Sequence, residues 1–263
     1  MQKKNKKNDL PKISLITPCL NQEKFIERTI LSVLNQDYPN LEYIFVDGGS
    51  TDGTLEILKK YADKIIITSQ KDSGQTEAIN KGIRKSTGDV LAYLNADDLL
   101  CPGALDKVGS TFKKENCLWL TGHCIVINET GKEVRTFISK YKNFFLRFFR
   151  TFSFLVILNY ISQPSTFYRR QIIKKAGEYS ENWDYSMDYD YWLRIAKIFK
   201  LTYIDSDLSL FRTHNHSKSR MFLKAQQKES YQIAKIHSDS ELLLFLHKVH
   251  DFIVFTIYKF INK

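Results

Sequence analysis

Apolar and polar residues follow two patterns along the first half of the chain. Short apolar runs predict buried strands, and between them apolar residues recur every three or four positions, as on one face of a helix. The expected strands are Ile13–Thr17, Leu41–Val46, Lys64–Thr68 and Val90–Leu94. The expected helices are Glu23–Asn35, capped by Asn21, then Thr51–Tyr61, Gln75–Lys85 and about 102–114. Strands that alternate with helices of this length predict an α/β fold with a mostly parallel sheet and right-handed crossovers.

The second half of the chain is less regular. Cys117–Asn128 and Lys132–Phe137 are expected to form a hairpin around a turn at residues 129–131. The other expected elements are an extended segment at Pro164–Tyr168, a helix at Asp188–Phe199, and strands at Leu201–Asp205 and Leu208–Arg212. From about Phe222 onward the pattern is helical. We therefore predict a basic tail at residues 1–11, one α/β domain at 12–220 and an amphipathic helical extension at 221–263.

Two acidic motifs each follow a predicted strand. The run Tyr43–Val46 ends in Asp47-Gly-Gly-Ser-Thr-Asp-Gly53, and the run Val90–Leu94 ends in Asn95-Ala-Asp-Asp98. Ligands of open α/β sheets bind outside the carboxyl ends of the strands. Oxygen ligands at such an edge suit Mg²⁺ or Mn²⁺. The two motifs therefore predict a site that holds a nucleotide and a divalent cation together.

These motifs resemble those of the family 2 glycosyltransferases, which have the GT-A nucleotide-sugar-binding fold. The matching segments are Ser14–Pro18, Ile30–Gln36, Val46–Gly53, Asp72–Gly74, Asn80–Gly82, Thr87–Asp89, Asn95–Asp98, Gln163–Phe167, Met187–Asp190 and Arg212–His214. They cover roughly residues 12–219 in the order found in the family. The resemblance implies a Rossmann-like GT-A domain, with a nucleotide-binding half at about 12–100 and an acceptor half at about 101–220.

For the nucleotide, the resemblance implies contacts from Thr17, Pro18, Asp47, Asp72, Asn95 and Ala96. Asp47 is expected to bind the base, with Thr17 and Pro18 lining the same pocket. Asp72 is expected to contact the base or the ribose, and Asn95 the ribose. A structural alternative stays open for both aspartates, because an aspartate at a turn also accepts hydrogen bonds from nearby backbone amides.

For the metal ion, the resemblance implies Asp97 as the chief carboxylate ligand, with Asp98 supporting it. Asn95 occupies the first place of the family's common Asp-X-Asp motif, so one anionic ligand is missing there. His214 is implied as a further ligand or as a group that steadies the diphosphate. The expected cofactor is Mn²⁺ or Mg²⁺. The alternatives are a surface Asp-Asp turn and a structural histidine.

Asp188 is expected to be the general base that takes the proton of the acceptor hydroxyl. Tyr191 and Trp192 follow it at helical spacing, so one face of this helix is expected to be buried and to hold the carboxylate in place. The alternative is that Asp188 only caps the helix. Asp190 is expected to face elsewhere and to pair with Arg194, four residues later.

The acceptor side is implied to include Gln163, Pro164 and Ser165, although an edge segment containing proline explains them equally well. The resemblance implies a non-processive, inverting, metal-dependent hexosyl- or N-acetylhexosaminyl-transferase. The sequence has neither the Gln-x-x-Arg-Trp segment nor the membrane helices of the family's processive synthases. Such an enzyme would move one sugar from a nucleotide-sugar, with a UDP-sugar as the expected donor, to a glycan or lipid-linked acceptor in cell-surface polysaccharide or lipopolysaccharide biosynthesis.

Two other functions remain open. A nucleotidyltransferase also uses a nucleotide, a metal ion and acidic residues, but it would typically carry a Gly-rich triphosphate loop near the first strand, where this chain has Thr17-Pro-Cys-Leu20. A catalytically silent sugar-nucleotide-binding or scaffold subunit of a membrane-associated glycan assembly complex is the second alternative. It is suggested by Asn95 and by Met187, which stands where many relatives have Glu.

The excess positive charge lies entirely in the second half of the chain. Residues 1–130 contain equal numbers of acidic and basic residues, and residues 131–263 carry the whole net charge of +10. Aromatic and basic residues are interleaved over Tyr141–Phe154, and residues 241–263 repeat this character. The pattern predicts docking on an anionic membrane, with a buried helix or a subunit interface through the tail as alternatives. No nucleic-acid-binding motif is present, so nucleic acid is not an expected partner.

The remaining features of the sequence favour the cytoplasm. The apolar run Ile13–Leu20 is too short, and too interrupted by Thr17 and Pro18, for a signal peptide. No window approaches the ~18 apolar residues of a transmembrane helix. The four cysteines form no CxxC pair and are expected to be reduced thiols. We expect a cytoplasmic enzyme that associates peripherally with the inner face of the cell membrane.

Overall fold

The centre of the molecule is an eight-stranded sheet. The computed structural model describes residues 9–114, 116–215, 217 and 221–261, and its strands lie in the order β3-β2-β1-β4-β7-β6-β8-β5. Their bounds are β1 Ile13–Cys19, β2 Leu41–Asp47, β3 Ile66–Ser69, β4 Val90–Tyr93, β5 Leu99–Leu100, β6 Trp119–Ile127, β7 Thr166–Arg169 and β8 Thr202–Arg212. β1 pairs in parallel with β2 and β4, and β2 with β3, which confirms the parallel arrangement predicted for the first half.

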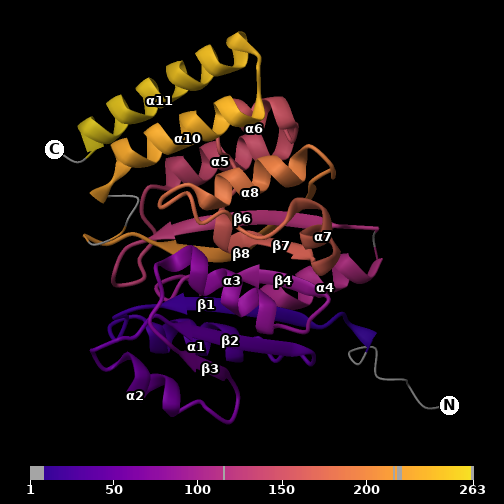
Figure 1. Ribbon diagram of the computed structural model, residues 1–263, viewed down its shortest axis with the longest axis vertical. Helices are drawn as coiled ribbons and strands as arrows, with labels where there is room; N and C mark the ends of the chain where they lie inside the picture. The colour runs from indigo at the N-terminus through magenta and orange to yellow at the C-terminus, as the bar shows by residue number, and fades with distance from the viewer. Residues whose placement is uncertain (1–8, 115, 216, 218–220, 262–263) are drawn as a thin grey trace.

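Helices flank this sheet and form a separate layer at one end of the molecule. The α-helices are α1 Ile26–Leu34, α2 Thr54–Lys59, α3 Gln75–Lys85, α4 Ala104–Lys114, α5 Thr136–Phe148, α6 Phe152–Ile157, α7 Ile173–Ala176, α8 Met187–Ala196, α10 Leu223–His237 and α11 Glu241–Ile261. Short 3-10 turns lie at η2 Gln163–Ser165 and η3 Arg170–Ile172. Figure 1 shows α10 and α11 beyond α5, α6 and α8, at the end opposite to β3 and α2.

The mostly apolar sequence of β1 has a simple cause. All seven of its residues are buried, because a central parallel strand is covered on both faces. α3 packs closely against this strand through Gly82, where an added Cβ would lie 2.4 Å from Cγ2 of Ile16. The close approach brings the first turn of α3 to the carboxyl end of β1.

The hairpin predicted in the second half is confirmed only next to its turn. Lys132–Phe137 forms no strand: a single bridge joins Ile127 to Glu133, and α5 already begins at Thr136. β6 pairs instead with β7, antiparallel, and with β8, in parallel. Its partners therefore come from segments far along the chain, which local turn signals do not reveal.

Two smaller predictions also differ from the structure. The strands expected at 201–205 and 208–212 are one strand, β8, whose register with β6 shifts on both sides of His123. α1 begins at Ile26 without a side-chain cap. Asn21 instead accepts a hydrogen bond from the backbone N–H of Thr51, at 2.9 Å, and so joins the loops that follow β1 and β2.

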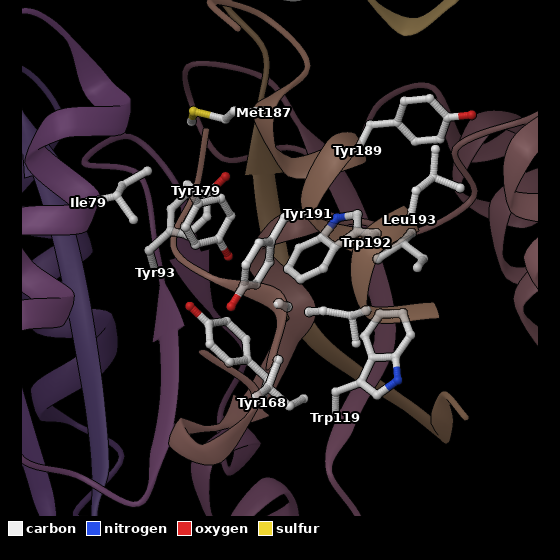
Figure 2. Close-up of a cluster of buried hydrophobic side chains, with 14 of the residues drawn as sticks. Ile79, Tyr93, Trp119, Tyr168, Tyr179, Met187, Tyr189, Tyr191, Trp192 and Leu193 are labelled. Atoms are coloured by element: carbon white, nitrogen blue, oxygen red, sulfur yellow. The ribbon is translucent and has the colours of Figure 1, made fainter. Parts of the chain in front are cut away.

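Aromatic packing fixes α8 against the sheet. Figure 2 shows Tyr191 and Trp192 of α8 in a buried cluster with Trp119 of β6 and Tyr168 of β7. The rings of Trp119 and Trp192 are stacked, with centroids 6.0 Å apart. Burial of side chains of this size contributes several kcal/mol, so the orientation of α8 is strongly determined.

The C-terminal helices are attached to the α/β domain by specific polar contacts. Nε2 of His237 in α10 lies 2.9 Å from the Asp190 carboxylate of α8. The carboxylate of Glu229 accepts hydrogen bonds from the backbone N–H groups of residues 184–186, in the loop that leads into α8. Nδ1 of His247 in α11 lies 2.7 Å from the carbonyl oxygen of Val156. In the described part of the chain, no helix is long and apolar enough to cross a membrane.

Candidate active site

A cavity of about 640 Å³ opens at the carboxyl ends of β1 and β4. Its other walls come from the first turn of α3, from one face of α5, from the segment before β7 and from the first turn of α8. This is the edge of an α/β sheet at which ligands bind.

Most of the residues predicted from the sequence line this cavity. They are Pro18, Asp72, Asn95, Ala96, Asp97, Gln163, Pro164, Asp188 and His214. Thr17, Asp47, Asp98 and Ser165 are fully buried and are not among its lining residues. The hydroxyl of Thr17 lies 3.2 Å from that of Tyr43, so Thr17 supports the pocket from behind.

Asp47 and Asp72 occupy different positions around the loop that follows β2. The Asp47 carboxylate accepts hydrogen bonds from the backbone N–H groups of Gly49 and Ser50, both at 3.1 Å, and from the Ser69 hydroxyl at 2.7 Å. These bonds hold the loop, which is the structural alternative left open by the sequence. Asp72 does reach the cavity, and Gly48 makes room for it, because a Cβ there would lie 2.9 Å from the Asp72 carboxylate.

Asp97 and His214 form a pair at the cavity wall. Nε2 of His214 lies 2.9 Å from Oδ2 of Asp97, and the Phe25 ring packs beside the imidazole with centroids 5.0 Å apart. Neighbouring ligands of an octahedral ion at about 2.1 Å lie about 3 Å apart, so this pair suits a shared Mn²⁺ or Mg²⁺. No group of three or more His, Cys, Asp or Glu suited to a metal ion occurs among the described residues. The other ligands of such an ion would therefore be water and substrate oxygens.

Asp98 has a different position from the supporting ligand that the sequence suggested. Its carboxylate is buried and accepts hydrogen bonds from the backbone N–H of Arg212, at 2.9 Å, and from the side-chain amide of Asn95, at 3.1 Å. Burial, and next the charge of Asp97, raise the pKa of Asp98 well above its ordinary value. In this structure Asp98 holds the loop that carries Asp97.

Arg212 completes that support and had no role in the sequence analysis. Its Nε donates a hydrogen bond to the backbone carbonyl of Asp97, at 2.8 Å. Its terminal nitrogen donates to the carbonyls of Asn128 and Glu129, at 3.0 and 2.9 Å. The buried guanidinium thereby fixes the end of β8, and with it His214, relative to Asp97.

Asp188 lies in the first turn of α8 and faces the cavity. The helix begins at Met187 after Ser186, so Asp188 is not its cap residue. Burial raises the pKa of Asp188, against the lowering effects of the Tyr189 backbone N–H and of the Lys142 charge. Asp190 faces away and pairs with Arg194 at 2.9 Å, as predicted.

Hydrogen bonds to strands of the sheet hold the segment Gln163–Ser165, which precedes β7. The side-chain amide of Gln163 donates to the carbonyl of Tyr93 at the end of β4, at 2.6 Å, and Gln163 and Pro164 line the cavity. The Ser165 hydroxyl is buried, donates to the carbonyl of His123 at 2.7 Å and lies 2.6 Å from the Ser209 hydroxyl. Ser165 therefore joins the strands behind the cavity wall.

Sequence reasoning missed one wall of the cavity. Arg135, Ile138, Ser139 and Lys142 line it from α5. The available signal was the helical spacing of these residues within a stretch otherwise dominated by aromatic residues. The strand predicted at 132–137 hides this helical spacing, because it overlaps the start of α5.

Comparison with known proteins identifies the family. The sequence profile described as glycosyl transferase family 2 matches residues 14–177. The chain belongs to this family. An uncharacterized glycosyltransferase of Methanocaldococcus jannaschii is 28% identical over 240 residues, which are 87% of this chain and 80% of that protein. The chain is therefore a glycosyltransferase.

A relative with a more specific description matches a shorter region. The putative teichuronic acid biosynthesis glycosyltransferase TuaG of Bacillus subtilis is 34% identical over 125 residues. The match covers 45% of this chain and 49% of TuaG. This glycosyltransferase thus has a homologue described as acting in the biosynthesis of a polysaccharide.

Solved structures show the same fold. S. aureus TarS 1-349 in complex with UDP-GlcNAc has a TM-score of 0.68 at 17% identity, covering 88% of this chain and 68% of that chain. The mannosyltransferase PcManGT from Pyrobaculum calidifontis, in complex with GDP-Man and Mn²⁺, has a TM-score of 0.69 at 17% identity and covers 91% and 70%. At these identities the likeness shows the fold alone, and that fold is GT-A.

Proposed function

We propose that this protein is a non-processive, inverting glycosyltransferase that moves one hexosyl or N-acetylhexosaminyl group from a UDP-sugar to a hydroxyl of a glycan or lipid-linked acceptor. We place it in the biosynthesis of a cell-surface polysaccharide or lipopolysaccharide. Support comes from the family, from TuaG, and from TarS, whose structure contains UDP-GlcNAc. GDP is the competing nucleotide, since PcManGT was solved with GDP-Man.

The observation that carries the proposal is the convergence of three chemical functions on one cavity. Asp72 and Asn95 offer hydrogen-bonding groups to a nucleoside, the Asp97–His214 pair suits a divalent cation, and Asp188 offers a carboxylate with a raised pKa. These residues come from different elements of the fold and meet at one cavity. A sugar transfer from a nucleotide-sugar requires these three functions: nucleotide binding, cation binding and a general base.

The proposed reaction is a single displacement. Asp188 accepts the proton of the acceptor hydroxyl while that oxygen bonds to the anomeric carbon and the bond from this carbon to the diphosphate breaks. Asp97 and His214 would hold the Mn²⁺ or Mg²⁺ ion, which when bound offsets the charge that develops on the leaving diphosphate. Arg212 and Asp98 keep Asp97 in place, and the aromatic packing of α8 keeps Asp188 in place.

A panel of ligands tests this function. UDP, GDP, ADP and their sugars are added to the purified protein with Mn²⁺, with Mg²⁺ or with a chelator, and the melting temperature is followed. We expect UDP compounds to stabilise the protein only with a divalent ion, because ligands that bind the folded state raise its stability by mass action. The transfer function is refuted if no nucleoside diphosphate or nucleotide-sugar shifts the melting temperature under any of these conditions.

We also propose that the enzyme works at the inner face of the cell membrane. Apolar side chains on α11 are exposed at Leu242, Phe245, Val249, Phe252, Ile253 and Ile257, and on α5 at Phe137, Tyr141, Phe144 and Phe148. Tyr141 stacks with His250, with ring centroids 6.2 Å apart, so the two helices meet. The net charge of +10 in the second half favours an anionic lipid surface.

Removing two of these aromatic residues should weaken membrane binding. The double variant Phe245→Ser and Phe252→Ser is expected to lose at least about tenfold in affinity for vesicles containing phosphatidylglycerol, since each buried Phe contributes about 1.5–3 kcal/mol. Binding is measured by co-sedimentation at low and high salt, and Leu31→Ser on α1 is the control. If the wild-type protein ignores anionic vesicles at low salt and instead forms an oligomer that the double variant loses, α11 is a subunit interface.

A further inference from the structure

One face of α5 forms a wall of the cavity that the proposed reaction leaves unused. Ser139 and Lys142, three residues apart, line the cavity together with Ile138, and Arg135, which precedes the helix, lines it too. Residues at this spacing lie on the same face of a helix. The nucleoside-facing and metal-facing residues come from other walls, so this face points to a different part of the substrates.

Ser139 is the first sign of a ligand on this wall. Its side chain is only 8% exposed, and among the described residues its hydroxyl has no hydrogen-bond partner. A buried hydroxyl without a partner is unfavourable and uncommon in folded proteins. The Ser139 hydroxyl is therefore suited to donate a hydrogen bond to an atom that enters the cavity.

Lys142, one turn later, is the second sign. Within the described residues its ammonium group makes no direct hydrogen bond or ion pair, although the residue is half-buried and lines the cavity. Burial lowers the pKa of Lys142, while the Cys124 thiol and the Asp188 carboxylate act in the opposite direction. A cation held at a cavity wall without a direct partner is costly, and an anion from the substrate would offset that cost.

The start of α5 adds a third favourable feature. The helix follows Arg135, which has a φ of +53°, and it has neither a side-chain cap nor an acidic residue in its first turn. Backbone N–H groups at a helix start, together with the helix dipole, favour negative charge. Ser139 and Lys142 thus line the cavity together with Arg135, next to the positive end of the helix.

We propose that this face of α5 binds an oxyanion of the acceptor, next to the hydroxyl that Asp188 deprotonates. The Ser139 hydroxyl donates a hydrogen bond to the oxyanion, and the Lys142 ammonium pairs with it. Ser139, Lys142 and Asp188, the proposed base for the acceptor hydroxyl, line the same cavity, and the charge of Asp188 acts on Lys142. The assignment to the acceptor rests on the proposed function.

The acceptor class is therefore anionic. Two sources supply the same chemistry: a phosphate group, as in a lipid-linked or polyol-phosphate acceptor, and the carboxylate of an acidic sugar. Their size and number of oxygens differ, so simple probes separate them. Inorganic phosphate represents the first source and glucuronate the second.

The experiment measures binding of these probes to the protein saturated with Mg²⁺ and the nucleoside diphosphate that stabilises it. Titration calorimetry should detect one of the two anions. Lys142→Met should weaken its binding by about tenfold or more, the scale of a hydrogen-bonded charge. Ser139→Ala should weaken it less, and Lys140→Met, an exposed position on the same helix, should leave it unchanged.

Each outcome decides a separate point. Binding of phosphate indicates a phosphorylated acceptor, and binding of glucuronate indicates an acidic sugar. The proposal is overturned if neither anion binds, or if binding is the same in Lys142→Met and Ser139→Ala as in the wild type. If Lys142→Met does not fold, Ser139→Ala alone decides. If no nucleoside diphosphate binds at all, the proposed function fails, and the anion titrations on the free protein still test this wall.

Discussion

Asp188→Asn is expected to lower kcat by about 10²–10⁴ while the affinity for the donor stays near the wild-type value. The substitution keeps the size and hydrogen-bonding capacity of the side chain but removes its ability to accept a proton, and loss of a general base has this scale. The side chain faces the cavity from a helix that the buried Tyr191 and Trp192 fix in place, so the fold should be unaffected. Transfer is measured under single-turnover conditions, and donor affinity by calorimetry.

The pH profile gives this prediction a second readout. The base must be ionised to act, and burial raises the pKa of Asp188, so wild-type activity should fall on the acid side at a pH above the ordinary range for aspartate. That limb should disappear from the residual activity of the variant. Asp184→Asn, which removes another carboxylate of the same cavity, is the matched control.

Near-normal turnover in Asp188→Asn would move the role of base to another group. A wild-type protein that binds donor but shows no turnover with any acceptor, and no sugar-nucleotide hydrolysis, would instead favour the catalytically silent scaffold subunit. Turnover of the wild-type protein separates the two results, because donor binding is expected to be retained in both proteins in either case.

Asp97→Ala is expected to abolish Mn²⁺-dependent donor binding, with a loss of at least about 100-fold. Removal of a residue that merely orients a metal ligand costs 10–100-fold, so loss of the carboxylate ligand itself should cost at least the upper value. The carboxylate is partly exposed at the cavity wall, and the support from Arg212 goes to the backbone of Asp97. Folding stability should therefore change little. UDP titrations with and without Mn²⁺ measure the effect.

Asp98→Ala is the informative comparison, because the Asp98 carboxylate is buried behind the cavity wall and holds the loop that carries Asp97. Its loss leaves the buried N–H of Arg212 and the Asn95 amide without their partner, which should lower the free energy of unfolding by about 1.5–3 kcal/mol in urea titrations. Undiminished Mn²⁺-dependent UDP binding in Asp97→Ala, or a greater loss of metal dependence in Asp98→Ala, would contradict the assignment of the ligand to Asp97.

The fold of the first half of the chain could be predicted closely from the sequence because its information is local. β1, β2 and β4 are mostly apolar, and the connections from β1 to β2, from β2 to β3 and from β3 to β4 are helices with their own period. The residues at the carboxyl ends of parallel strands must then meet at one edge. This reasoning placed Asn95 and Asp97 at the edge where the cavity opens, and the resemblance to the family added Pro18.

The distinction between lining and supporting residues could not be predicted in the same way. Asp97 and Asp98 are adjacent in the sequence and chemically identical, yet one faces the cavity and the other is buried against Arg212. Asp47 and Asp72 likewise both follow strands, but only Asp72 reaches the cavity. Which carboxylate faces inward depends on donors from other elements.

The sequence by itself determined the α/β class, the alternation of the first half and the set of polar residues at the sheet edge, since these depend on periodicity and on strand ends. Only the tertiary structure decided the pairing of β6 with β7 and β8, the helical form of α5 and the place of Lys142 in the same cavity as Asp188. The physical reason is that β6 exchanges hydrogen bonds with segments far along the chain. A short run such as 132–137 takes the conformation that its surroundings, rather than its own residues, make more favourable.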